Sequence, residues 1–313
     1  MEEDGRIARL KRQSRARLGG ELDRFETPYD VLASPGWRGV EAETFLSSSG
    51  GRSEIIKSYL PETDFYINVP ASLHAAQNAA SMGIGPQITE QDPKAGVLVM
   101  EYLGDGWRVA GLHDAVNSKT RMAVINAKKR FQAGPACLND GDPFNEIHKL
   151  ADIVKTLGLL CPPHLSSWLT FADEVGARIN ALGKERRPCH RDGNISNVML
   201  GPAGEMRLLD YDLAANADPY EDLGSFLMEM FDSTATARGG FEEWMGYFNE
   251  GEFYRAMAYG ILDDLRWGLI GVVMSARSQR RALEFSKCAS WRLLRFVDQM
   301  AWFNRQDCLL AMV

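Results

Sequence analysis

Hydrophobic positions along the chain change their spacing near residue 104, which divides it into two unlike parts. Residues 5–24 carry apolar side chains at helical spacing, which predicts an N-terminal helix. Short apolar runs bounded by serine, proline and glycine then predict three strands, a helix and a further strand. The three strands are expected at residues 29–32, 39–46 and 54–60, the helix at 71–82 and the last strand at 96–102.

Helical patterns dominate from about residue 107 onward, with one interruption. Two apolar runs at residues 197–200 and 206–209 flank a turn rich in glycine and proline, which predicts a β-hairpin. We therefore expect an α+β fold with two lobes. Residues 1–104 would form a small lobe with an antiparallel sheet and a helix, and residues 105–313 a larger, mainly helical lobe.

Composition narrows the class of protein. The 313 residues are 45% hydrophobic and 25% charged, as in ordinary globular proteins, and the net charge of −7 argues against a nucleic-acid partner. The five scattered cysteines indicate neither a disulfide framework nor a zinc site. With no apolar run long enough to span a membrane and no signal-peptide pattern at the start, we expect a cytoplasmic protein.

The candidate chemistry lies at the predicted hairpin. His190, Asp192 and Asn197 form the pattern His-x-Asp-x-x-x-x-Asn before the first strand, and Asp210 follows the second strand. This layout suits phosphoryl transfer, because Asp192 can accept a proton from a substrate hydroxyl while Asn197 and Asp210 offer oxygen ligands to Mg²⁺. A polar turn with solvated carboxylates is the alternative. The apolar strands that bracket both polar clusters favour the phosphotransferase.

Residues 189–231 resemble the signature of the choline/ethanolamine kinases and their aminoglycoside phosphotransferase relatives, which share a two-lobed protein-kinase-like fold. The resemblance implies ATP and Mg²⁺ as cofactors, Asp192 as catalytic base and Asn197 and Asp210 as metal ligands. It implies that His190 and Asp222 support the catalytic loop. The short interval between Asp210 and Asp222 leaves no room for the activation segment of protein kinases, so a protein substrate is disfavoured.

The small lobe offers candidate nucleotide contacts. Lys57 lies in the third predicted strand, where the resemblance places a cation against the nucleotide phosphates; a lysine facing water is the alternative. Glu101 and Tyr102 lie in a segment that resembles the hinge beside the adenine, and that is equally typical of a buried strand. A turn at residues 34–39 occupies the place of a phosphate-covering loop, although it has only two glycines.

One departure from the family concerns the partner of Lys57. The glutamate expected on the helix at residues 71–82 falls at Ser72, and this helix has no acidic residue. His74 and Gln77 are the nearest polar candidates for its role.

The acceptor is expected to be a small alcohol that carries an amine. Residues 264–273 and 283–296 resemble the choline-kinase helices that line the alcohol site with aromatic rings. Trp267, Trp291 and Glu229 match positions where ring faces and a carboxylate would attract an ammonium group. Packing in the hydrophobic core is the alternative role of the tryptophans.

Other functions stay open from sequence. An aminoglycoside- or sugar-type kinase could use the same scaffold, although residues 119–164 have few acidic residues for a polycationic substrate. A kinase-like binding module without activity is a third reading, and Mg²⁺-dependent ATP turnover would separate it from an enzyme. The oligomeric state, a homodimer included, is not fixed by the sequence.

Overall fold

The computed structural model describes residues 2–28, 41–159, 162–280, 282–303 and 305–312. Its strands are β1 (Arg24–Glu26), β2 (Ala42–Ser49), β3 (Arg52–Tyr59), β4 (Ile88–Asp92), β5 (Val97–Glu101), β6 (Arg108–Val109), β7 (Arg187–Cys189), β8 (Val198–Leu200), β9 (Met206–Leu208) and β10 (Ala215–Ala217). Its α-helices are α1 (Glu2–Leu18), α2 (Val69–Ser81), α3 (Leu112–Ala115), α4 (Ser118–Gln132), α5 (Pro143–Thr156), α6 (Leu165–Leu182), α7 (Pro219–Met230), α8 (Thr234–Met245), α9 (Glu250–Arg277), α10 (Phe285–Trp302) and α11 (Arg305–Ala311). This mixture of a five-stranded antiparallel sheet, two smaller sheets and many helices confirms the predicted α+β fold class.

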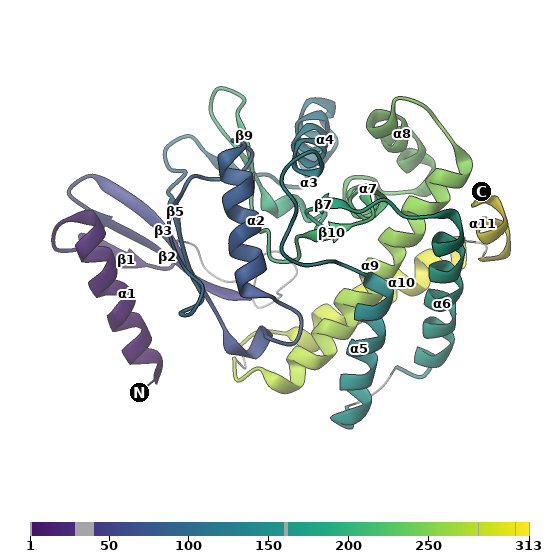
Figure 1. Cartoon of the computed structure of the whole chain (residues 1–313), viewed down its shortest axis with the longest axis horizontal. Coiled ribbons are helices and arrows are strands. Elements are labelled where there is room, and N and C mark those ends of the chain that lie inside the picture. Colours follow the sequence, from purple (N-terminus) through teal and green to yellow (C-terminus); the bar gives the residue numbers. More distant parts are fainter. Residues whose placement is uncertain (1, 29–40, 160–161, 281, 304, 313) are drawn as a thin grey trace.

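The small-lobe sheet lies between two helices. Its five strands follow the order β1-β2-β3-β5-β4, with every neighbouring pair antiparallel. Helix α1 covers one face, where Leu10 packs with Ile56 and Val99, and α2 lies on the opposite side (Figure 1). Since side chains alternate along a strand, Lys57 points to the face away from α1. The sheet therefore presents Lys57 toward the helical lobe.

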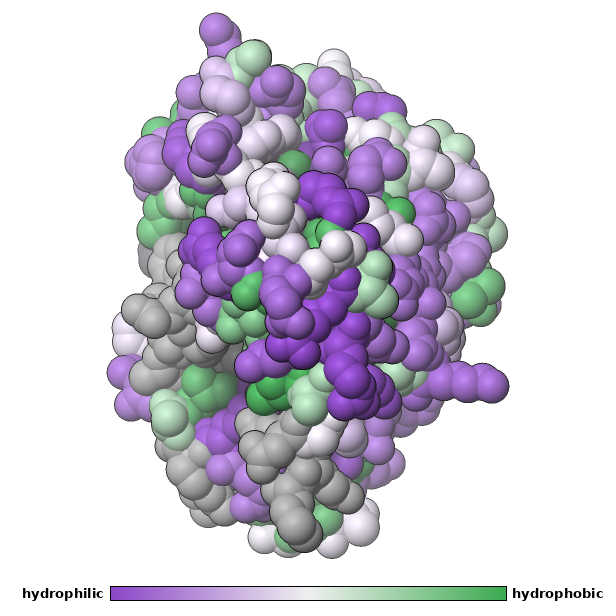
Figure 2. Space-filling view, turned by 90° about the vertical axis from the view of Figure 1, so that its left-hand side faces the viewer, coloured by the Kyte–Doolittle hydropathy of each residue, from purple (hydrophilic) through white to green (hydrophobic). Residues whose placement is uncertain are grey.

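The outer face of this lobe is polar. Figure 2 looks onto the side of the molecule that carries α1 and shows mostly hydrophilic residues with small apolar patches. Arg17 of α1 forms an ion pair with buried Glu54 of β3, 2.8 Å apart. The arginines of α1 thus help to fix this helix on the sheet.

Several predicted boundaries in the small lobe were wrong. The first helix ends at Leu18 instead of residue 24, and Arg24–Glu26 forms a strand. The expected strand at residues 29–32 lies outside the described residues. Strand β2 continues past its expected end at residue 46 to Ser49, since residues 47–49 pair with β3, and the Ser14 hydroxyl of α1 donates to that of Ser47 at 2.7 Å. The polar edge strand Ile88–Asp92 gave no apolar signal and was missed.

The helical lobe is arranged around α9, which packs against α5, α7 and α10. Helices α7 and α9 touch closely, since a Cβ added to Gly224 would lie 2.2 Å from the Ala256 carbonyl oxygen. The predicted hairpin is confirmed as β8 and β9, and β6, just past the expected boundary at residue 104, pairs with β8. None of the helices described is long and apolar enough to span a membrane.

Candidate active site

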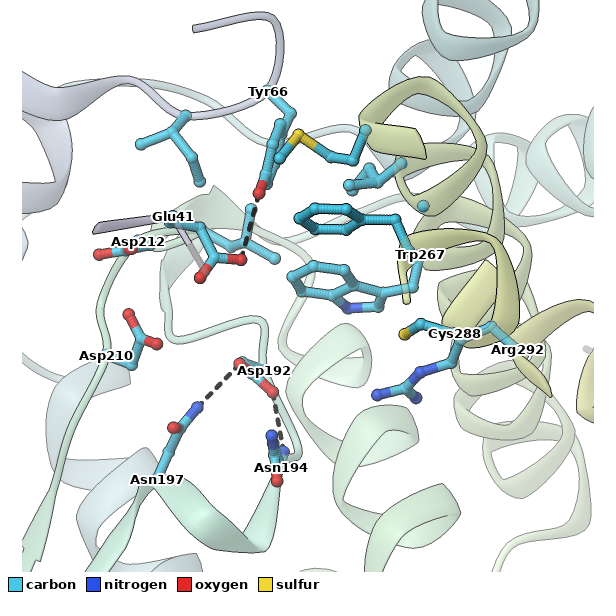
Figure 3. A pocket seen from close by; sticks show the side chains of 16 residues that line it. Glu41, Tyr66, Asp192, Asn194, Asn197, Asp210, Asp212, Trp267, Cys288 and Arg292 are labelled. Atoms are coloured by element: carbon cyan, nitrogen blue, oxygen red, sulfur yellow. Dashed lines mark hydrogen bonds between the residues drawn. The ribbon is translucent and has the colours of Figure 1, made fainter. Parts of the chain in front are cut away.

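The catalytic loop connects β7 to β8 and brings Asp192 and Asn197 together. Asp192 accepts hydrogen bonds from the backbone N–H of Asn194 at 2.8 Å and from the side-chain amide of Asn197 at 2.9 Å (Figure 3). These two bonds hold the carboxylate in one orientation while its residue stays partly exposed. The predicted pair therefore lies in contact at the rim of a pocket.

His190 lies below this loop and links it to the second metal-ligand candidate. Its ring is buried, with Nδ1 3.0 Å from the carbonyl oxygen of Asp192 and Nε2 2.8 Å from that of Leu209, next to Asp210. Burial and the positive charge of Lys128 lower the pKa of His190. The position suits the predicted supporting role.

Asp222 fixes the backbone of the catalytic loop through hydrogen bonds. Its fully buried carboxylate accepts hydrogen bonds from the backbone N–H groups of His190 and Arg191, at 3.2 and 2.9 Å, and pairs with Lys128 at 2.8 Å. The Lys128 ammonium also donates to the carbonyl oxygen of Asp192 at 2.8 Å. Burial alone would raise the pKa of Asp222, but Lys128 and His190 hold it below its ordinary value. A buried ion pair thus fixes the backbone beside Asp192.

Two residues of the site have an unusual backbone. Arg191 and Asp210 are the non-glycine residues with positive φ in the described chain, at 65° and 63°. The left-handed region is unfavourable for side chains with a Cβ, and such residues cluster at functional sites. The Arg191 guanidinium forms ion pairs with Glu146 and Glu221, both at 2.8 Å, and these offset the cost of its backbone conformation.

Lys57 meets the large lobe at the end of β9. Its ammonium lies 2.7 Å from Asp210 and 2.7 Å from Asp212, and the Tyr59 hydroxyl donates to Asp212 at 2.6 Å. Burial lowers and the two aspartates raise the pKa of Lys57, with the net value well above the ordinary one, so this lysine is charged. Lys57 therefore faces the site and not water.

The suggested partners of Lys57 were wrong. His74 contacts Asn78 and Gln77 contacts Gln91, so neither reaches the lysine. Ser72, at the position of the absent glutamate, instead donates its hydroxyl to the backbone carbonyl of Asp212 at 3.0 Å. Asp212 thus supplies the second carboxylate for the lysine from the other lobe.

Two adjoining pockets share three lining residues. The larger lies under the sheet and is lined by Lys57, by Glu101 and Tyr102 of the expected hinge, and by apolar side chains of both lobes. The smaller lies toward α9 and α10 and contains Asp192 and Trp267. The residues common to both linings are Asn197, Asp210 and Asp212. The turn predicted at residues 34–39 lies outside the described residues.

The predicted acceptor residues do not all meet in the smaller pocket. Trp267 of α9 lines it, with the edge of Tyr66 against its ring at a centroid distance of 6.3 Å. Trp291 is 69% exposed and lines neither pocket, because Arg292, the next residue of α10, points inward and successive helical residues differ by about 100°.

Glu229 also lies outside both linings. Its carboxylate accepts from the backbone N–H of Ile195 at 3.2 Å and lies 3.9 Å from Arg295, behind the catalytic loop. An ammonium-binding cage of Trp267, Trp291 and Glu229 is therefore not formed.

Sequence reasoning missed several lining residues of the smaller pocket. Glu41 precedes β2, Tyr66 lies in the turn before α2 and Arg292 lies in α10, and none belongs to a short motif. Burial and the Asp210 charge raise the pKa of Glu41 to about 6. Its proximity to Asp210 depends on how the two lobes meet, which no local pattern encodes.

The geometry of the site agrees with the protein family that the sequence matches. Residues 34–257 match the model of the phosphotransferase enzyme family, APH. The chain belongs to this family. Membership makes it a phosphotransferase that acts on a hydroxyl acceptor, as the sequence resemblance implied. No curated protein sequence matches the chain.

Solved structures of choline/ethanolamine kinases and of an aminoglycoside phosphotransferase have a similar fold. The choline kinase LicA from Streptococcus pneumoniae is 18% identical with a TM-score of 0.75, covering 94% of this chain and 98% of that one. A choline/ethanolamine kinase family protein from Mesorhizobium loti is 19% identical with a TM-score of 0.76, covering 98% and 99%. A GDP complex of an aminoglycoside 2′-phosphotransferase-IIIa variant is 12% identical with a TM-score of 0.64, covering 94% and 97%. At such identities these similarities establish the kinase-like fold and leave the acceptor open.

Proposed function

We propose that this phosphotransferase transfers the γ-phosphate of ATP to the hydroxyl of a small alcohol that carries an amine. The observation that carries the proposal is the pair of pockets that meet at Asn197, Asp210 and Asp212. A nucleotide in the larger pocket and an alcohol in the smaller one would approach each other across these side chains. Asp192 lies on the alcohol side only, as a base for the acceptor hydroxyl should.

The residues predicted to contact the nucleotide and the metal then have roles in the larger pocket. The backbone near Glu101 and Tyr102 would receive the adenine edge, and Lys57 would pair with the phosphates. The oxygen donors of Asn197 and Asp210 fit Mg²⁺, which prefers amide, carboxylate and phosphate oxygens. When bound, Mg²⁺ would neutralise the charge that builds up on the transferred group. A cytoplasmic location, where ATP is available, stays a prediction.

The carboxylate of Asp192 is already oriented for its proposed role as the base. Asp192 is oriented by its bonds to Asn194 and Asn197, so its carboxylate can accept the hydroxyl proton as the oxygen attacks phosphorus. His190 and Asp222 hold the loop from below and touch no substrate pocket. They position Asp192 through the backbone.

The lining of the smaller pocket supports an amine-bearing acceptor of modest size. Trp267 and Tyr66 offer ring surfaces to a cation, and the surrounding carboxylates make the pocket acidic. Arg292, paired with Asp264 at 3.1 Å, places one positive charge in the wall. Because Asp264 compensates that charge, the lining remains acidic and suits a cationic amine.

The test is ADP release with a panel of amino alcohols, sugars and aminoglycosides in the presence of Mg²⁺ and ATP. We expect turnover above background with an amino alcohol and its loss in Asp192→Asn. Turnover only with sugars or aminoglycosides would replace the acceptor class. A chain that binds ATP and turns over no acceptor would be a binding module.

A further inference from the structure

Glu41 carries a buried oxygen atom that has no hydrogen-bond partner within the described part of the chain. The residue directly precedes β2 and is 5% exposed. Its Oε1 accepts from the Tyr66 hydroxyl at 3.2 Å, whereas Oε2 has no partner among the described residues. A buried carboxylate oxygen left without a partner is unfavourable for folding. Such an atom is expected where a ligand completes the site.

The free oxygen lies on the side of the aspartates. Figure 3 shows the Glu41 carboxylate between Tyr66 and Asp210, with the oxygen that does not bond Tyr66 turned away from Trp267. Oxygen atoms of Glu41, Asp210 and Asp212 lie within 4.8 Å of one another. Ligands of one cation are separated by about 3 to 4 Å for Mg²⁺ and up to about 5 Å for larger divalent ions. The cluster therefore has the spacing of ligands around a single ion.

The charge of the cluster favours a divalent ion. Among the described residues, three carboxylates face one ammonium, that of Lys57, which bonds both aspartates and does not bond Glu41. The excess negative charge is buried, where carboxylates repel one another strongly. A divalent cation offsets it and gives the Glu41 oxygen a partner.

We propose that Glu41 is a ligand of a divalent cation that it shares with Asp210 and Asp212. Glu41 belongs to the small lobe, and the aspartates follow β9 in the large lobe, so the ion would connect the two lobes at the nucleotide phosphates. This inference rests on the proposed function, because it assigns Asp210 the same role as a metal ligand. It adds a ligand that the catalytic motifs do not contain.

The experiment measures metal binding without nucleotide or acceptor. Mn²⁺ is titrated calorimetrically into the wild-type protein, into Glu41→Gln and into the control Glu43→Gln. Glu43 lies in β2, which Glu41 directly precedes, and pairs with Arg6 outside the pockets, so its variant removes an equal charge from the same lobe. We expect Mn²⁺ affinity to fall about tenfold or more in Glu41→Gln and to change less than about twofold in the control.

Thermal unfolding gives a second readout. Glu41→Gln keeps an acceptor for Tyr66 and removes an unpaired buried charge, so its melting temperature without metal should equal or exceed that of the wild type. Added Mn²⁺ should raise the melting temperature of the wild type more than that of the variant. If Glu41→Gln does not fold, Glu41→Asp replaces it, since the shorter side chain keeps the charge and withdraws the oxygen.

Three results would overturn the inference. These are unchanged Mn²⁺ affinity in the Glu41 variant, absence of Mn²⁺ binding in the wild type, and normal metal binding with a raised KM for an amine-bearing alcohol. The last result would make Glu41 an acceptor ligand. None of these results tests the proposed phosphotransfer reaction. That proposal is refuted separately if the wild type releases no ADP with any alcohol.

Discussion

The buried pair of Asp222 and Lys128 should stabilise the fold and hold the catalytic loop at once. Asp222 is fully buried and Lys128 is 1% exposed, with 2.8 Å between their charged atoms. The Asp222 carboxylate also accepts from His190, Arg191 and Gln132. Replacing Asp222 by Asn leaves one acceptor oxygen for four donors and leaves the Lys128 charge unpaired.

The expected cost follows from that geometry. Removing one partner of a buried ion pair destabilises a protein by about 3–5 kcal/mol. Lys128→Met removes the other charge, so the double variant should lose less stability than the two single variants added together, by about 1–3 kcal/mol. Activity should fall in all three, because the backbone beside Asp192 loses its anchor.

Urea denaturation measures the free energy of unfolding, and Glu284→Gln is the control. Glu284 pairs with Lys287 on the surface, where both side chains are about half exposed, so its loss should cost less than about 1 kcal/mol. The pKa of Asp222 is lowered in the folded state, so its stabilisation is present at neutral pH and is lost as the pH falls through that pKa. The deficit of Asp222→Asn should therefore shrink below about pH 4. A deficit under 1 kcal/mol, or additive single variants, would refute this reasoning.

The remaining predictions concern chemistry, acceptor and packing. Asp192→Asn should fold and bind ATP but turn over about 10²–10⁴-fold more slowly, and near-normal turnover would exclude it as the base. Asp210→Ala should abolish Mg²⁺-dependent turnover and Asn197→Ala should weaken it less; unchanged Mg²⁺ titrations in both would contradict the metal assignment. Trp267→Leu should raise KM for a cationic alcohol up to about thirtyfold and spare its neutral isostere, while equal changes would place Trp267 in the core only. Gly224→Ala should lower the free energy of unfolding by about 1–3 kcal/mol or more, because its Cβ would clash with the Ala256 carbonyl. Gly239→Ala, with open space around it, should not destabilise α8. Similar melting temperatures for the two variants would show that α7 and α9 can separate.

Local sequence predicted the centre of the site well. The hairpin of β8 and β9 forms where two apolar runs flank a glycine-rich turn, and Gly204 has the positive φ that such a turn uses. Because Asp192 and Asn197 lie within one short loop, their spacing places them close together, and they form a hydrogen bond. Asp210 follows the strand that pairs with β8 and lines the same two pockets as Asn197.

Contacts between distant segments could not be predicted in this way. The family pattern leads to a search for the partner of Lys57 on α2, yet Asp212 of the other lobe takes that place and Ser72 holds its backbone. Likewise, the matched sequence of α10 suggests an inward Trp291. A shift of one residue turns a helix by about 100°, so Arg292 faces the pocket instead.

The sequence by itself determined the phosphotransferase class of this protein, because the residues of its family signature lie in loops whose geometry is set within a few residues. Only the tertiary structure decided which side chains line the smaller pocket. Glu41, Tyr66 and Arg292 reach the pocket from separate elements, and their meeting depends on how the small-lobe sheet, α9 and α10 pack together. That packing is a sum of many weak apolar contacts, and no single motif records it.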